Sequence, residues 1–327
     1  MSIRPNVGNP DRPRFATVCV QGSPARQYRS CVKRLVLLTA IVCKINKQWE
    51  NLDAVIFPGG FLRLNRTIGE LPYDERTDAL CAAGLVEPIK NAIKLMTKSR
   101  DPVLVFGVDG PTYRNGDGGD QLCVAANKNG IVSISRKIFP TKNESDSLLC
   151  FDADYHDPHR VVVLAGGRNA TLSACYDMFG LVERGNPCGT RARYIRWIGR
   201  YNAQMERGDE GFNEHLAENL CSFNSVLTKK NVTVGIAAIH YFRGHNTAFW
   251  QRHGIAACSA ALGGGFVIGA AHFAELPQTA NSSTLAAAGV RAQVGQDMRN
   301  RQAHSWQPAG HFTFASTDGS ALVRLFC

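Results

Sequence analysis

A cysteine and a lysine stand out among the residues that could do chemistry. Cys175 ends an apolar stretch that begins at Arg160, and Lys137 lies a few dozen residues upstream. A thiol at the mouth of a buried strand, close to an ammonium group that lowers its pKa, suits acyl transfer through a covalent thioester. The alternative is a structural cysteine, because the chain has 11 cysteines and a cysteine in an apolar run is commonly a small buried side chain.

The elements that would position these residues alternate along the chain between short β-rich runs and longer helical stretches. The strands are expected at 16–20, 54–57, 103–108, 122–126, 131–135, 161–165, 172–176, 232–240, 266–270 and 321–326. The helices are expected at 26–48, 76–98, 190–204, 213–227 and 248–262. The first helix is expected to bury Val32, Leu35, Val36 and Thr39, which recur at helical spacing.

Two turns predict antiparallel neighbours. Asn127-Lys-Asn-Gly130 lies between two strand predictions, and Asn-Gly suits a tight hairpin turn. Lys137 would then lie just past the end of the second hairpin strand. A second turn, at Asp318-Gly319, is expected to join the last strands.

Four segments in order resemble the nitrilase, or carbon-nitrogen hydrolase, superfamily. They are residues 16–21, residues 52–58, Arg136-Lys137 before Ile-Phe-Pro, and Ala174-Cys-Tyr-Asp177. The resemblance implies an α/β protein with a four-layer α-β-β-α sandwich, in which residues 15–327 form one domain after a loose tail at 1–14. It also implies a homodimer, with the helix expected at 190–204 in its interface.

The resemblance also implies roles for individual residues. Cys175 would be the nucleophile, Lys137 would stabilise the tetrahedral intermediate, and Glu144 would match the second glutamate of the family. The substrate would be a small amide or nitrile, attacked to give a thioester or thioimidate, with no cofactor and no metal. The chain departs from the family at its general base, because the expected Phe-Pro-Glu reads Phe57-Pro58-Gly59.

Three explanations of the missing base stay open. Another acid could take its place, with Glu70, Asp74 and Glu75 the nearest downstream. Alternatively, Cys175 is activated by Lys137 alone or by a histidine such as His240 or His245. Finally, the chain could be a non-catalytic relative that binds a metabolite or a partner through the same pocket.

Composition fits a cytoplasmic enzyme. No apolar run approaches the length of a membrane span, and no secretory signal is visible. The cysteines show no Cys-x-x-Cys spacing, so we expect neither a zinc site nor a disulfide framework. The net charge of +10 raises a nucleic-acid hypothesis, for which Arg191-Ala-Arg-Tyr-Ile-Arg-Trp-Ile-Gly-Arg200 is the best local support. The same spacing suits a helix that buries its aromatic side chains, and no nucleic-acid partner is expected.

Overall fold

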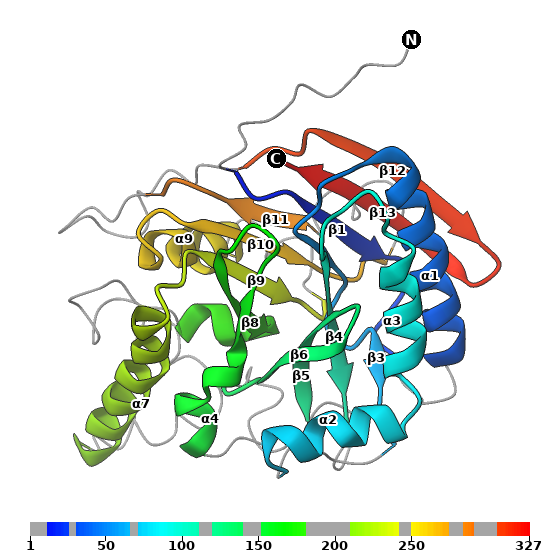
Figure 1. Cartoon of the computed structure of the whole chain (residues 1–327). Coiled ribbons are helices and arrows are strands. Elements are labelled where there is room, and N and C mark those ends of the chain that lie inside the picture. Colours follow the sequence, from blue (N-terminus) through cyan, green and yellow to red (C-terminus); the bar gives the residue numbers. More distant parts are fainter. Residues whose placement is uncertain are drawn as a thin grey trace.

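The computed structural model places two β-sheets between layers of helices (Figure 1). It describes residues 12–25, 31–65, 71–110, 120–139, 152–180, 210–241, 250–274, 284–290 and 306–327. Among these residues, no helix is long and apolar enough to cross a membrane.

The first sheet has eight strands and is mixed. In spatial order they are β12 (Gly310–Ser316), β13 (Gly319–Phe326), β1 (Phe15–Val20), β2 (Ala54–Ile56), β4 (Val103–Asp109), β5 (Gln121–Asn127) and β6 (Gly130–Arg136), with β3 (Leu62–Arg63) paired to β4. Strands β1, β2 and β4 run parallel, whereas both hairpins are antiparallel. The predicted hairpin at Asn127-Lys-Asn-Gly130 is confirmed, because Asn127 pairs with Gly130 across a two-residue reversal.

The second sheet has five strands. In spatial order they are β11 (Thr284–Ala287), β10 (Phe266–Ala270), β9 (Val234–Ala238), β8 (Asn169–Ala174) and β7 (Val161–Val163). The three central strands β8, β9 and β10 are parallel, so their carboxyl ends meet at one edge of the sheet.

The helices cover the outer faces of the two sheets. The first group consists of α1 (Cys31–Gln48), α2 (Tyr73–Ala82) and α3 (Val86–Lys94), and the second of α4 (Asp152–His156), α7 (Glu210–Lys229), a π-helix (Trp250–Ala256) and α9 (Ala257–Ala261). Figure 1 shows α1 and α3 on one side of the sheets and α7 and α9 on the other. One apolar core lies under each helical layer, and a third lies between the sheets, where Ile56 and Val105 of the first sheet join Leu172 and Ile236 of the second. The four-layer sandwich is therefore confirmed.

The single helix predicted at 76–98 is wrong, because two helices occupy this range. Gly84 separates α2 from α3 with a φ of +72°, and its backbone N–H donates to the carbonyl of Cys81. A left-handed glycine is a common helix terminator, since it lacks the Cβ that penalises this conformation.

The buried face predicted for the first helix is wrong at Val32 and Val36, although Leu35 packs against the core. Val32 and Val36 are 69% and 51% exposed, whereas Leu37, Leu38 and Ile41 are buried, with Val42 and Ile45 following one turn later. A continuous apolar run offers more than one stripe at helical spacing, and only packing against the sheet decides which stripe is buried.

Candidate active site

Cys175 lies on a strained turn directly after β8. The strand predicted to run to Tyr176 ends at Ala174, and a 3-10 helix begins at Cys175 (Cys175–Gly180). Cys175 has a φ of 53°, although it is not a glycine, and it is only 5% exposed. Left-handed backbone at a non-glycine residue costs free energy, and it recurs where a sharp strand-to-helix turn presents a nucleophile.

Asp177 ties this turn to the segment that carries Lys137. Its Oδ1 accepts hydrogen bonds from the backbone N–H groups of Ile138 at 2.9 Å and Phe139 at 3.0 Å. Lys137, which directly precedes these donors, follows the last residue of β6 as predicted. The structure therefore brings Lys137 and Cys175 together from two different sheets.

The side chain of Lys137 is held in the interior. It is fully buried, and its Nζ donates to Oε1 of Gln121 at 3.0 Å. Burial raises the pKa of Tyr176 to about 12; the charge of Cys175 adds to this rise, and the charge of Lys137 opposes it. The charges of Cys175 and Lys137 therefore both reach the ring of Tyr176.

The pKa of Asp177 gives a test of this connection. Burial raises it to about 7, against the opposing effect of hydrogen bonds from Phe139 and Ile138 and of the charges of Arg160 and Lys137. The fold therefore favours the neutral acid, whose stabilising contribution is complete below the ordinary pKa near 4 and is lost as the pH rises through about 7.

Asp177→Asn should remove this pH dependence, because a neutral amide oxygen can still accept both N–H groups. Relative to the variant, the wild-type free energy of unfolding should fall between pH 4 and pH 7 by up to about 4 kcal/mol. Urea unfolding of both proteins across this range measures the difference. Parallel curves for the two proteins would show that Asp177 does not titrate in this range.

His240 comes to the same edge of the second sheet. It lies two residues after β9, and Ala174 of β8 pairs with Ala238 of β9, so Cys175 and His240 leave neighbouring parallel strands. The Nε2 of His240 lies 2.8 Å from Oδ1 of Asp109, the last residue of β4 in the first sheet. Both side chains are partly accessible, at 16% and 14%.

The imidazole interacts with the thiol of Cys175 as well as with the carboxylate. Burial lowers the pKa of His240, but the charge and hydrogen bond of Asp109 and the contact with Cys175 outweigh it and raise the pKa above its ordinary value. Because Asp109 occupies Nε2, Nδ1 is the ring nitrogen that remains for the interaction with Cys175. The imidazole thus lies between a carboxylate and a thiol.

Gly59, the position at which the sequence resemblance led us to expect a glutamate, leaves no room for a side chain. Its backbone N–H donates to the carbonyl of Ile239 at 2.9 Å. A Cβ at this position would lie 2.6 Å from Nδ1 of His240 and 2.8 Å from the carbonyl oxygen of Ala238. The imidazole of His240 therefore stands at the point where a side chain of residue 59 would begin.

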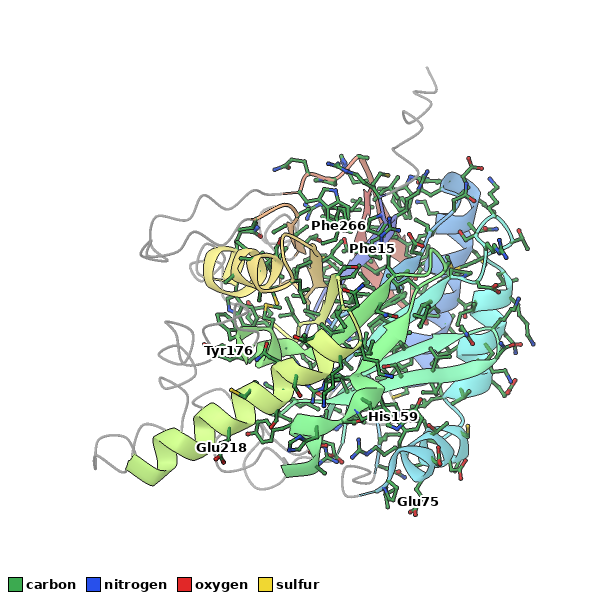
Figure 2. The ribbon with its side chains drawn as sticks, turned by 60° about the vertical axis from the view of Figure 1, so that its left-hand side comes forward. Phe15, Glu75, His159, Tyr176, Glu218 and Phe266 are labelled. Carbon is green, nitrogen blue, oxygen red and sulfur yellow. The ribbon has the colours of Figure 1, made fainter. Side chains whose placement is uncertain are left out.

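The other candidates from the sequence do not meet at this site. Glu70, Glu144, His245 and the segment 190–204 lie outside the described residues. Asp74 and Glu75 are exposed in the first turn of α2. Figure 2 shows Glu75 well separated from Tyr176, the neighbour of Cys175. Neither carboxylate occupies the space next to Gly59.

Two residues of the site were missed in the sequence. Asp109 lies just after the strand expected at 103–108 and Gln121 just before the strand expected at 122–126, and neither was expected to have a role. Each is a polar residue at the end of a buried strand, and this pattern could have identified both. Polar side chains at the ends of buried strands are common at the active sites of α/β proteins.

Comparisons with known proteins return solved structures. No protein-family model and no curated protein matches the chain. An amidase from Nesterenkonia sp. superposes with a TM-score of 0.50 at 12% identity, covering 96% of this chain and 90% of that one. A mutant of the amidase from Nesterenkonia sp. AN1 carries the acetamide moiety of fluoroacetamide at its active-site cysteine. It superposes with a TM-score of 0.51 at 12% identity, covering 99% of this chain and 93% of that one. A further mutant, described as a Nesterenkonia AN1 amidase from the nitrilase superfamily, superposes with a TM-score of 0.48 at 11% identity, covering 95% of this chain and 90% of that one.

Proposed function

Since the chain has the fold of nitrilase-superfamily amidases, we propose that it is a carbon-nitrogen hydrolase that acts on a small amide or nitrile through Cys175. The observation that carries the proposal is the left-handed turn at Cys175 beside the buried Lys137. A cysteine that only fills space in a core needs no strained backbone, whereas a nucleophile presented at a strand end does.

In this mechanism, the thiolate of Cys175 attacks the carbonyl or nitrile carbon of the substrate. The ammonium of Lys137 and the backbone N–H of Tyr176 stabilise the negative charge that develops on the former carbonyl oxygen or nitrile nitrogen. Water then releases the acid from the thioester or thioimidate. Glu144 positions Lys137 or the substrate amine, as the resemblance implies.

The burial of the site supports a small substrate. Cys175 is 5% exposed and Lys137 is fully buried, so a folded polypeptide cannot bring its backbone to the sulfur. Tyr176 stacks on Phe179 at 4.2 Å and meets Trp250 edge-on at 5.5 Å, which places an aromatic wall beside the nucleophile. A compact amide or nitrile matches this environment better than a charged polymer.

Fluoroacetamide tests whether Cys175 is the reactive residue. The probe is chosen because it modifies the active-site cysteine of the Nesterenkonia mutant. We expect one acetamide adduct, on Cys175, detected by intact mass and peptide mapping, and no adduct at that position in Cys175→Ser. The exposed Cys81 and Cys221 serve as internal references for ordinary thiol reactivity. Adducts on these two cysteines with Cys175 unmodified would refute the proposal.

A second candidate is a nitrilase-fold binding or scaffold protein that no longer turns over substrate. Gly59 favours it, because glycine cannot transfer a proton. Ammonia release from a panel of small amides separates the two candidates, since a binding protein would form no product. The proposal includes a homodimer, as the resemblance implies, and a cytoplasmic location, as the cysteine pattern indicates, without a cofactor, metal or nucleic acid.

A further inference from the structure

We infer that His240 and Asp109 replace the missing glutamate, so that Cys175, His240 and Asp109 act as nucleophile, general base and orienting carboxylate. This inference rests on the proposed function and adds to it the source of proton transfer. Its basis is the meeting of three strand ends, from β8, β9 and β4, with the imidazole between the other two groups.

Three glycines make room for this arrangement. A Cβ at Gly59 would lie 2.6 Å from Nδ1 of His240, and a Cβ at Gly60 would lie 2.6 Å from Oδ2 of Asp109. Gly60 also has a φ of +59°, which few side chains adopt. A Cβ at Gly107 would come within 2.3 Å of the Cα of Gly59. The His240–Asp109 pair therefore requires a glycine at position 59, and a glutamate there could not coexist with the pair.

The hydrogen bond to Asp109 sets the tautomer of the imidazole. Nε2–H donates to Oδ1 at 2.8 Å, so Nδ1 is the nitrogen that takes the proton of the thiol, and the raised pKa of His240 favours the resulting thiolate–imidazolium pair. Catalytic triads use the same logic, in which the carboxylate orients the base and stabilises its cation. The partial exposure of both side chains, at 16% and 14%, separates the pair from a fully enclosed structural ion pair.

Among the residues that the structure describes, His272 also lies against His240, and it does not compete for the proton of His240. His272 follows β10, and its backbone N–H donates to the carbonyl of His240 at 3.1 Å. Burial and the positive charges of Arg34 and His240 keep the pKa of His272 well below its ordinary value. His272 is therefore neutral when His240 carries a proton, and the groups that favour that proton are Asp109 and Cys175.

Cys175 and His240 can carry out every proton transfer that amide hydrolysis requires. The thiol of Cys175 gives its proton to Nδ1 of His240, the C–S bond forms, and the carbonyl π electrons move to oxygen. The oxyanion then re-forms the C=O bond as the C–N bond breaks, and the imidazolium protonates the leaving nitrogen, so that ammonia departs and the thioester remains. A water molecule gives a proton to Nδ1 while its oxygen attacks the thioester, and breaking the C–S bond returns the thiolate, which takes that proton back.

The test compares His240→Ala and Asp109→Asn with His272→Gln, which changes a buried imidazole outside the unit. The first readout is the rate of iodoacetamide alkylation of Cys175 against pH, followed by peptide mass spectrometry. In the wild type and in His272→Gln, alkylation should stay fast down to about pH 6. In His240→Ala, it should fall at least about tenfold there and follow an ordinary thiol, whose pKa is near 8.5.

The second readout is turnover of the amide that the wild type hydrolyses best. We expect a loss of about a hundred- to ten-thousand-fold in His240→Ala and in Asp109→Asn, the latter because the tautomer is no longer fixed. Asp109→Asn preserves side-chain volume, so the test holds even if His240→Ala does not fold. Thermal melts report the folded state of each variant.

The outcomes separate this inference from the proposed function. Adduct formation and turnover that persist in both variants, with an unchanged alkylation profile, would overturn the inference and leave Cys175 as the nucleophile. A shifted alkylation profile in a wild type that hydrolyses no amide or nitrile would support the Cys175–His240 pair and overturn the proposed hydrolysis. Alkylation at the ordinary thiol rate in every protein would overturn both.

Discussion

Replacing Cys175 by alanine should abolish hydrolysis, and replacing Lys137 by alanine should lower kcat/KM several hundred-fold. In the proposed mechanism, the first change removes the atom that forms the covalent intermediate, and the second removes a preorganised donor to the developing oxyanion, worth about 3 kcal/mol. The double variant should be scarcely slower than Cys175→Ala alone, because members of one catalytic unit are strongly non-additive. Steady-state kinetics of the three variants measure these effects.

The backbone at Cys175 provides a matched control for folding. With a φ of 53°, this position favours glycine over alanine, so Cys175→Gly should be more stable than Cys175→Ala by about 1 kcal/mol while being equally inactive. Thermal melts of the pair separate chemistry from packing. Residual activity that follows the folded fraction across these variants would mark Cys175 as a structural residue.

Gly59→Glu should destabilise the protein and lower its activity, even though it introduces the residue that the sequence resemblance led us to expect there. The new Cβ would lie 2.8 Å from both the carbonyl oxygen of Ala238 and the backbone nitrogen of His240, which cannot rotate away. Overpacking of this kind lowers the free energy of unfolding by about 1 to 3 kcal/mol. Displacement of His240 should lower kcat/KM by about a hundred-fold or more.

A compensating substitution sharpens this prediction. Gly59→Glu combined with His240→Gly removes the 2.6 Å contact with the imidazole and loosens the backbone that the Cβ meets. The double variant should regain part of the lost stability, as urea unfolding measures, and Gly59→Ala reports the steric cost without the carboxylate. A gain of activity in Gly59→Glu alone, without loss of stability, would show that the wild-type site has simply lost its base.

The sequence predicted the parts of the site that are local. Cys175 and Lys137 each lie in a short segment next to a strand end, so motif and strand pattern together locate them. His240 entered only as one of several histidines, because its role depends on Asp109, which lies 131 residues away in the other sheet. A side-chain contact between two sheets produces no repeating residue pattern in either strand from which it could be predicted.

The fold follows the same division. Most strands were predicted because buried β-branched residues mark them, and the sandwich came from the family resemblance. Strand β12 was missed because His311, Thr313, Ala315 and Ser316 make it partly polar and exposed at the sheet edge. The break at Gly84 and the buried stripe of α1 depend on how the helices pack, which spacing alone does not determine.

The four site residues come from both sheets, so the reactivity of the site should report when the two sheets pack together during folding. Lys137 and Asp109 follow or end strands of the first sheet, whereas Cys175 and His240 follow strands of the second. A refolding intermediate with only one sheet formed holds half of the proposed catalytic groups, and a misplacement of about 1 Å at the interface between the sheets can cost a hundred-fold in rate. Recovery of rapid Cys175 alkylation during refolding would therefore time the docking of the two sheets, independently of secondary-structure formation.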